Sequence, residues 1–208
     1  MDAPRIAVVD YHKGNLSSVV RGLARAGAAA YATDNPDEIR SAEGLVLPGV
    51  GSFYDAIAYM SESGQDRAVM DAVANGAPFL GICLGLQILF ETSEESPGAQ
   101  GLGLLKGRIV RLPRESGLKI PHIGWNALHF PGGVRHPLLA SVEEGDCVYF
   151  VHSYYATDCA PAVIATTEYG AQLTAAVARG NVMGCQFHPE KSGDVGLAIL
   201  KTFCEGSW

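Results

Sequence analysis

The sequence predicts an α/β protein with an open, mostly parallel sheet, helices on both faces, and antiparallel strands added in the C-terminal half. Two observations indicate this class. From Ile6 to Phe90, short runs of apolar residues alternate with segments of helical periodicity, and uninterrupted apolar strands are typical of a parallel sheet buried on both faces. After Phe90 the helical segments give way to short β-like runs.

The first half supplies four strand signals with helix signals between them. We expect strands at 6–9, 28–32, 45–47 and in the apolar run ending at Ile82, and helices at 16–26, from Pro36, at 54–60, at 66–75 and after Cys83. Asn15 and Asn35 are suitable N-caps, because their side chains accept a hydrogen bond from a free helix N–H. Gly27 and Gly76 are suitable ends, because glycine readily adopts the left-handed conformation.

The second half contains mainly strand signals. Runs typical of strands occupy 109–112, 123–130, 148–152, 163–167, 173–177 and 182–187, and the apolar spacing of 194–204 predicts a closing helix. Some of these strands are expected to extend the main sheet. Without a linker or a repeat, the chain is interpreted as one domain covering residues 1–208.

Composition narrows the function classes. The net charge of −7 argues against binding to nucleic acid or an anionic membrane surface. Five scattered cysteines indicate neither a disulfide framework nor a metal site. The first residues lead directly into a strand without an export signal, and the longest apolar run is too short to span a bilayer. We therefore expect a cytoplasmic protein that uses no cofactor and no metal.

The segment Gly81-Ile82-Cys83-Leu84-Gly85 is the strongest chemical signal. A strand that turns sharply into a helix at Cys83 holds the thiol clear of the sheet, and the flanking glycines leave room for the bend. The free N–H groups of the new helix favour a thiolate there. Gln87 follows one helical turn later on the same face. The alternative is that Cys83 is a small apolar side chain in a packed strand.

A candidate base lies near the end of the chain, in His188-Pro189-Glu190. Residues two apart in extended backbone point to the same side, so Glu190 can hold the His188 imidazole while Pro189 fixes the bend. A carboxylate in that place sets the tautomer of the ring and stabilises the imidazolium formed when a thiol gives up its proton. The alternative is a solvated surface turn.

These two segments resemble those of class I glutamine amidotransferases, which are triad glutaminases with a flavodoxin-like fold. Further segments are similar to the glutaminase subunits of imidazole glycerol phosphate synthase. They are Asp10-Tyr11, Gly14-Asn15-Leu16, Pro48 to Phe53, Lys119 to Asn126 and Tyr149 to Tyr155. The resemblance covers almost the whole chain, and only His12-Lys13 departs from the small-residue turn of the family.

The resemblance implies a catalytic triad and a set of residues around glutamine. Cys83, His188 and Glu190 form the triad. Backbone N–H groups of Val50, Gly51 and Leu84 form the oxyanion hole. The substrate-binding residues implied are Gly49, Gly51, Gln87, Glu95, His152, Ser153 and Tyr154. The Pro48 loop is expected to stay in an unproductive arrangement until the partner subunit holds its own ligand.

The same resemblance implies L-glutamine as substrate and a heterodimer with a cyclase subunit. That subunit uses the ammonia to make imidazole glycerol phosphate and AICAR in histidine biosynthesis. The implied contact residues are Asn15, His122, Trp125, Asn126, Tyr149 and Lys191. For Trp125 and Tyr149 the alternative is core packing.

Two other functions remain open at this point. One is a glutaminase that serves another synthase or acts as a free-standing amidase. The other is a non-enzymatic α/β protein, such as an oxidant sensor or a chaperone, in which Cys83 is a reactive thiol. That second role has no need of His188 or Glu190.

Overall fold

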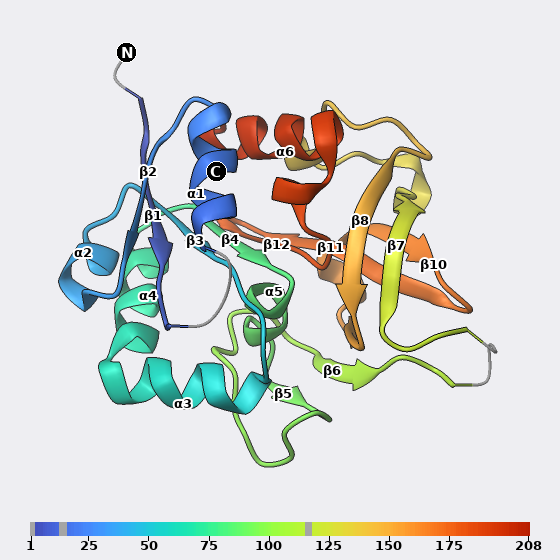
Figure 1. Cartoon of the computed structure of the whole chain (residues 1–208), viewed down its shortest axis with the longest axis horizontal. Coiled ribbons are helices and arrows are strands. Elements are labelled where there is room, and N and C mark those ends of the chain that lie inside the picture. Colours follow the sequence, from blue (N-terminus) through green and yellow to red (C-terminus); the bar gives the residue numbers. More distant parts are fainter. Residues whose placement is uncertain (1–2, 13–15, 115–117) are drawn as a thin grey trace.

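A seven-stranded sheet forms the centre of the protein (Figure 1). The structure is a computed structural model, and it describes residues 3–12, 16–114 and 118–208. The strands, in spatial order, are β10 (Val163–Glu168), β11 (Gln172–Arg179), β12 (Val182–Cys185), β4 (Phe79–Ile82), β3 (Gly44–Leu47), β1 (Arg5–Val9) and β2 (Ala29–Thr33). From β12 to β2 neighbouring strands are parallel, and β11 and β10 are antiparallel additions. The predicted fold class is confirmed.

Helices cover both faces of the sheet (Figure 1). On one face lie α1 (Leu16–Arg25) and α6 (Gly193–Glu205), and on the other α2 (Pro36–Arg40), α3 (Phe53–Ser63) and α4 (Gln65–Ala74). Adjacent strand residues face opposite layers. Val8 packs in the cluster that contains the α1 and α6 side chains, and Val9 packs in the cluster from α2, α3 and α4. Both faces of β1 are therefore core, which explains its unbroken apolar run.

Two smaller sheets complete the second half. β5 (Thr92–Ser93), β6 (Arg108–Arg111) and β9 (Tyr154–Thr157) form one, and β7 (His122–Ala127) pairs antiparallel with β8 (Cys147–His152) in the other. The sequence did not predict β5 or β9. The predicted strand at 123–130 is wrong at its end: after Ala127 the chain leaves β8, and His129 bridges to Thr166 of β10 instead.

Several predicted helix ends are confirmed. The Asp37 N–H donates to the Asn35 side chain at 2.9 Å, which makes Asn35 the N-cap of α2. Gly27 follows α1 with a φ of 98° and Gly76 follows α4 with a φ of 93°. Asn15, the predicted cap of α1, lies outside the described residues, as do Lys13 and Gly14.

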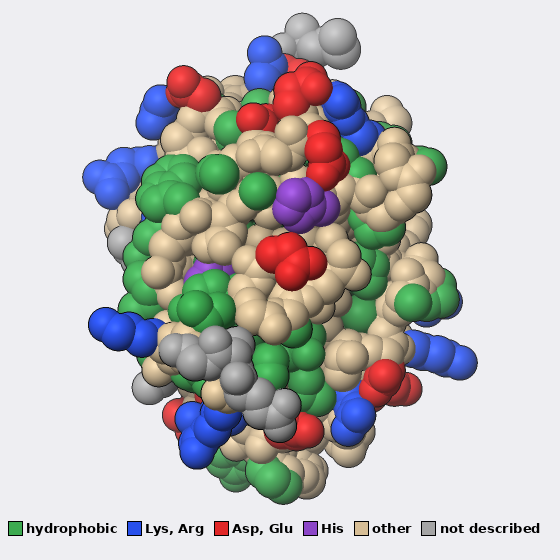
Figure 2. All heavy atoms as spheres, turned by 90° about the vertical axis from the view of Figure 1, so that its right-hand side faces the viewer, with side chains coloured by type: hydrophobic (Ala, Val, Ile, Leu, Met, Phe, Trp, Pro, Cys, Tyr) green, Lys and Arg blue, Asp and Glu red, His purple; other side chains and the backbone are tan. Residues whose placement is uncertain are grey.

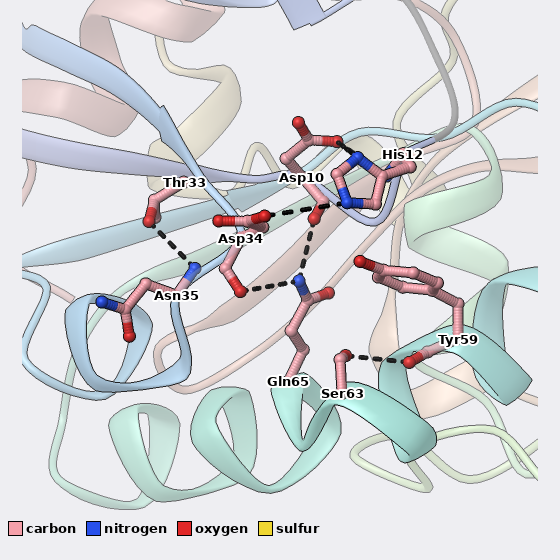
Figure 3. Close-up of polar contacts among 8 residues, drawn as sticks. All are labelled: Asp10, His12, Thr33, Asp34, Asn35, Tyr59, Ser63 and Gln65. Atoms are coloured by element: carbon pink, nitrogen blue, oxygen red, sulfur yellow. Dashed lines mark hydrogen bonds and ion pairs between the residues drawn. The ribbon is translucent and has the colours of Figure 1, made fainter.

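The turn after β1 is joined to its surroundings by a buried amide, as Figure 3 shows. Gln65, at the start of α4, donates through Nε2 to the Asp10 carbonyl at 2.8 Å and to the Asp34 carbonyl at 3.1 Å. His12 adopts a left-handed φ of 59°, and its ring meets the Tyr59 ring edge-on. Gln65 therefore holds the carboxyl ends of β1 and β2 together.

No helix in the described ranges has the length and apolar character that crossing a membrane requires.

Candidate active site

The turn between β4 and α5 (Leu84–Ile88) carries Cys83, as predicted. Cys83 has φ 55° and ψ −106°, a conformation that costs energy for a residue with a side chain. Close packing requires glycine on either side, because a Cβ on Gly85 would collide with the Leu47 carbonyl oxygen and one on Gly81 would lie 2.5 Å from the Gly85 oxygen. α5 spans only five residues and is shorter than the apolar spacing predicts, so its field at Cys83 comes from little more than one turn.

Strand β12 brings the second half of the site beside Cys83. It runs parallel to β4 with Cys185 opposite Ile82, and the Cys83 N–H donates to the Cys185 carbonyl at 2.8 Å. Residues just beyond Cys185 therefore leave the sheet at the same edge as the thiol. This edge is formed by the carboxyl ends of parallel strands, where open α/β sheets place their ligands.

His188 and Glu190 form a buried pair at this edge. Nδ1 of His188 lies 2.8 Å from Oε1 of Glu190, and their side chains are 5% and 4% exposed. The alternative of a solvated surface turn is therefore wrong. The backbone of His188 is fixed by the Ser192 hydroxyl, which donates to the His188 carbonyl at 2.6 Å and accepts the Tyr149 N–H at 2.9 Å.

Three influences set the pKa of His188. Burial lowers it most, but the neighbouring Cys83 sulfur and the Glu190 carboxylate together outweigh burial and raise it from 6.5 to about 9. The imidazole is thus largely protonated at neutral pH. In the described ranges Nε2 makes no well-aligned hydrogen bond, and the group that influences it is Cys83. A cationic ring beside a sulfur stabilises a thiolate relative to a thiol.

A pocket of about 260 Å³ opens over these groups. It is lined by Gly49, Val50, Gly51, Cys83, Leu84, Gln87, Glu95, Val151, His152, Ser153, Tyr154 and His188. The structure thus brings every residue predicted for the oxyanion hole and for substrate binding to one wall or another of the same pocket. Glu190 lies behind His188 and does not line it.

The side chains of Gln87 and Glu95 are held in place by hydrogen bonds to neighbouring residues. Gln87 donates through Nε2 to the Tyr154 carbonyl at 3.0 Å and to Oε1 of Gln186 at 3.2 Å. Glu95 accepts the N–H of Phe53, the first residue of α3, at 2.8 Å through one carboxylate oxygen. That contact joins the pocket floor to the end of the Pro48 loop.

A chain of polar contacts leads from the pocket wall to β7. His152 Nδ1 lies 2.9 Å from the Tyr154 carbonyl, and because a carbonyl only accepts, this nitrogen carries the proton. Nε2 of His152 lies 3.0 Å from Nδ1 of His122. Nε2 of His122 lies 2.7 Å from Asn126 Oδ1, and because Asn126 donates through Nδ2 to the Glu168 carbonyl, His122 is the donor in this contact. Burial lowers the pKa of His152 to about 4, so this ring is neutral.

The Pro48 loop rests on Tyr11. Tyr11 is 1% exposed, and a Cβ on Gly49 would collide with its hydroxyl. Burial and the nearby Cys83 raise the pKa of Tyr11, and the Val50 N–H acts in the opposite direction. The hydroxyl has no well-aligned partner among the described residues. It therefore lies against the peptide that is predicted to supply oxyanion donors.

The residues predicted to face a partner differ in exposure. Trp125 is 55% exposed and its ring meets that of Tyr149 at 6.0 Å, so core packing does not explain it. Lys191 is exposed, whereas His122 is buried between the Phe150 and Tyr169 rings. Asn15 lies outside the described residues. The face on the β7, β8 and β10 side of the molecule carries scattered hydrophobic side chains, with Asp or Glu and His side chains near its centre and Lys and Arg mainly toward its rim (Figure 2).

The sequence analysis missed three residues that support this site: Tyr11, Gln186 and Ser192. All three are buried polar side chains that act through neighbours distant in sequence. Only Gln186 had a local signal in the sequence. It lies two residues before His188, and residues two apart in extended backbone point to the same side. Among residues 3–12, 16–114 and 118–208, no three His, Cys, Asp or Glu side chains cluster as a metal site.

The fold and the pocket define a class of protein, and comparison with known proteins agrees with it. The profile of the family described as glutamine amidotransferase class-I matches residues 7–205, and the chain belongs to this family. Within it, the chain is 49% identical to imidazole glycerol phosphate synthase subunit HisH of Geobacillus sp. (strain WCH70), with 95% of each chain covered. It is 50% identical to subunit HisH of Gloeobacter violaceus, over 97% of this chain and 89% of that one.

A solved structure supports the fold independently. A chain in the structure of PurLQS from Thermotoga maritima superposes with a TM-score of 0.75 at 23% identity, over 97% of both chains.

Proposed function

We propose that this chain, acting as one domain over residues 1–208, is the glutaminase subunit of an imidazole glycerol phosphate synthase. It hydrolyses L-glutamine to L-glutamate and ammonia, and the ammonia passes to a cyclase subunit that makes imidazole glycerol phosphate and AICAR in histidine biosynthesis. The observation that carries the proposal is the meeting of Cys83, His188, Gln87 and Glu95 at one pocket, in a chain about half identical to HisH subunits.

The chemistry begins with the thiol. The reaction starts with the proton on His188 and a thiolate at Cys83, and the sulfur attacks the side-chain amide carbon of glutamine while the electron pair of the carbonyl moves to oxygen. His188 then protonates the leaving nitrogen, ammonia departs, and a thioester remains. Water, deprotonated by His188, adds to the thioester and releases glutamate and the Cys83 sulfur. Glu190 keeps the ring oriented through both steps.

The pocket walls supply the other functions. N–H groups of Val50, Gly51 and Leu84 bind the developing oxyanion, where each well-aimed donor lowers the barrier by about 3 kcal/mol. Gly49, Gln87, Glu95, His152, Ser153 and Tyr154 hold the amino-acid end of the substrate. The second oxygen of Glu95 is available for the α-ammonium group, because its first accepts Phe53 N–H. No cofactor enters the reaction.

The cyclase subunit docks over the β7 side of the pocket mouth and forms a heterodimer with this chain in the cytoplasm. The contact residues in this arrangement are Trp125, Tyr149, Asn126 and Lys191, and the resemblance adds Asn15, which lies outside the described residues. The half-exposed Trp125 side chain supports this surface. His122 acts from beneath it, through Asn126 on one side and His152 on the other.

One assay tests the proposal: glutamate release from glutamine by wild type and Cys83→Ala, each alone and with a cyclase subunit and its nucleotide ligand. Wild type is expected to be slow alone and strongly stimulated in the complex, and Cys83→Ala is expected to be inactive in both. Full turnover by the isolated chain would contradict the dependence on a partner.

The alternatives give different results in the same assay. Stimulation by another synthase, and not by the cyclase, would identify a different amidotransferase. Absence of glutamate in every combination, together with a His188→Ala chain that keeps its biological role, would indicate a non-enzymatic reactive cysteine.

A further inference from the structure

Gln186 is a buried amide beside the nucleophile that the steps above do not use. It follows β12 directly, its side chain is fully buried, and its backbone N–H donates to the Ala175 carbonyl at 2.8 Å. Its Nε2 lies 3.7 Å from Sγ of Cys83, within hydrogen-bonding distance for sulfur. A long polar side chain is rarely buried completely unless its groups are satisfied.

The orientation of this amide follows from its neighbours. The Tyr154 carbonyl can only accept, so the Gln87 atom 3.0 Å away is the nitrogen Nε2. That nitrogen is a donor, so the Gln186 atom 3.2 Å from it is the oxygen Oε1. The other end of the Gln186 amide, which faces the sulfur, is therefore Nε2 with its N–H. Reversing either amide would place two donors or two acceptors face to face.

We propose that Gln186 is a further catalytic residue, whose side-chain N–H donates to the Cys83 sulfur and stabilises the thiolate relative to the thiol. The inference rests on the proposed role of Cys83 as the nucleophile. A thiol sulfur is a weak acceptor and a thiolate a strong one, so the bond strengthens when the proton leaves for His188. It acts again when the thioester breaks and the sulfur departs with the electron pair.

A second contact acts on the same sulfur in the opposite direction. Sγ of Cys83 also lies 3.7 Å from the Val151 carbonyl, which can accept only from the protonated thiol. The Val151 contact thus favours the thiol, and the Gln186 N–H opposes it. Among the described residues, the titratable groups that act on the sulfur from other elements are His188 and Tyr11.

The test measures the pH dependence of Cys83 alkylation by iodoacetamide in the full chain, with modification at Cys83 quantified by mass spectrometry. Every protein carries Cys147→Ser, because Cys147 is exposed while Cys159, Cys185 and Cys204 are buried. In Gln186→Met, which keeps the length and removes the donor, the midpoint of alkylation is expected to rise by about one pH unit. At pH values below both midpoints the rate falls about tenfold.

The control is Gln172→Met, an exposed amide on β11, which is expected to leave the midpoint where it is. An unchanged midpoint in folded Gln186→Met, with wild-type circular dichroism, overturns the proposal. A purely structural role, such as support of Gln87, would alter glutamine binding without moving the alkylation midpoint.

If Gln186→Met does not fold, a measurement on the protein that keeps Gln186 tests the same hydrogen bond. The side-chain amide resonance of Gln186, followed by NMR across the same pH range, is expected to shift with the midpoint of Cys83 alkylation. A resonance that does not move overturns the proposal. Neither experiment uses glutamine, so the two proposals can fail separately. If the alkylation and NMR results are as expected but the chain releases no glutamate from glutamine, the proposed function is overturned and the inference about Gln186 stands.

Discussion

Replacing Glu190 by glutamine removes one charge from the buried pair with His188 and keeps its shape. The amide oxygen can still accept the Nδ1 proton, so the orientation of the ring changes little. The negative charge that stabilises the imidazolium is lost. The change therefore separates the electrostatic contribution of Glu190 from its positioning contribution.

The size of the effect follows from the geometry. The two groups are in contact at 2.8 Å and both side chains are about 95% buried. With charge centres about 4 Å apart and an effective dielectric constant of about 20, the attraction is about 4 kcal/mol. The attraction acts wherever the ring is cationic, so its loss lowers the population of the reactive thiolate–imidazolium pair and slows the reaction by up to about a thousandfold. The pKa of His188 falls by about 1–3 units in the variant.

The assay is glutamate release by the complex with the cyclase subunit, measured as kcat and KM for glutamine across pH. We expect kcat to fall with little change in KM, because Glu190 does not line the pocket. The matched control is Glu205→Gln, an exposed carboxylate on α6, which should leave both constants near wild type. A folded Glu190→Gln enzyme with kcat/KM within tenfold of wild type would refute the reasoning.

Further predictions follow from the same contacts. Gly85→Ala forces a Cβ onto the Leu47 carbonyl and is expected to destabilise the fold by about 1–3 kcal/mol in urea unfolding; wild-type stability would contradict that packing. Ser192→Ala removes the acceptor of the Tyr149 N–H and one of two donors to the His188 carbonyl, and is expected to cost about 1–3 kcal/mol, checked by thermal unfolding. The pKa of His188 is raised from 6.5 to about 9, so protonated His188 stabilises the folded state. Relative to His188→Asn, this contribution to the free energy of unfolding is complete below pH 6.5 and is lost as the pH rises through about 9. Denaturant titrations of both proteins between these pH values check the sign. Trp125→Ala is expected to weaken binding of the cyclase subunit in calorimetry while changing unfolding by less than about 0.5 kcal/mol, since the side chain is half exposed.

Local signals in the sequence predicted most of the sheet and helix pattern. The cap at Asn35, the end at Gly27 and the apolar run of β1 depend on neighbours a few residues away, and these predictions agree with the structure. The turn at Cys83 was predictable for the same reason, since its glycines are part of the segment itself.

Features that depend on distant partners were not predictable. Residues 123–130 pair with two different strands: β7 pairs with β8, whereas His129 bridges to Thr166 of β10. The periodicity of apolar residues does not reveal such a change of pairing partner. Gln186 became a candidate only when β12 was seen to pair with β4, which sets its amide against the sulfur. The buried hydroxyl of Tyr11 likewise gains meaning only from the loop packed over it.

The insertion of β12 beside β4 has a consequence for biosynthesis. Cys83 leaves the ribosome more than a hundred residues before His188, and the strand that carries the base has to pair with β4 before base and thiol meet. A nascent chain that already contains the first four strands therefore displays a cysteine without its proton acceptor. The pair of groups that the chemistry needs therefore exists only after β12 has been made and has paired with β4.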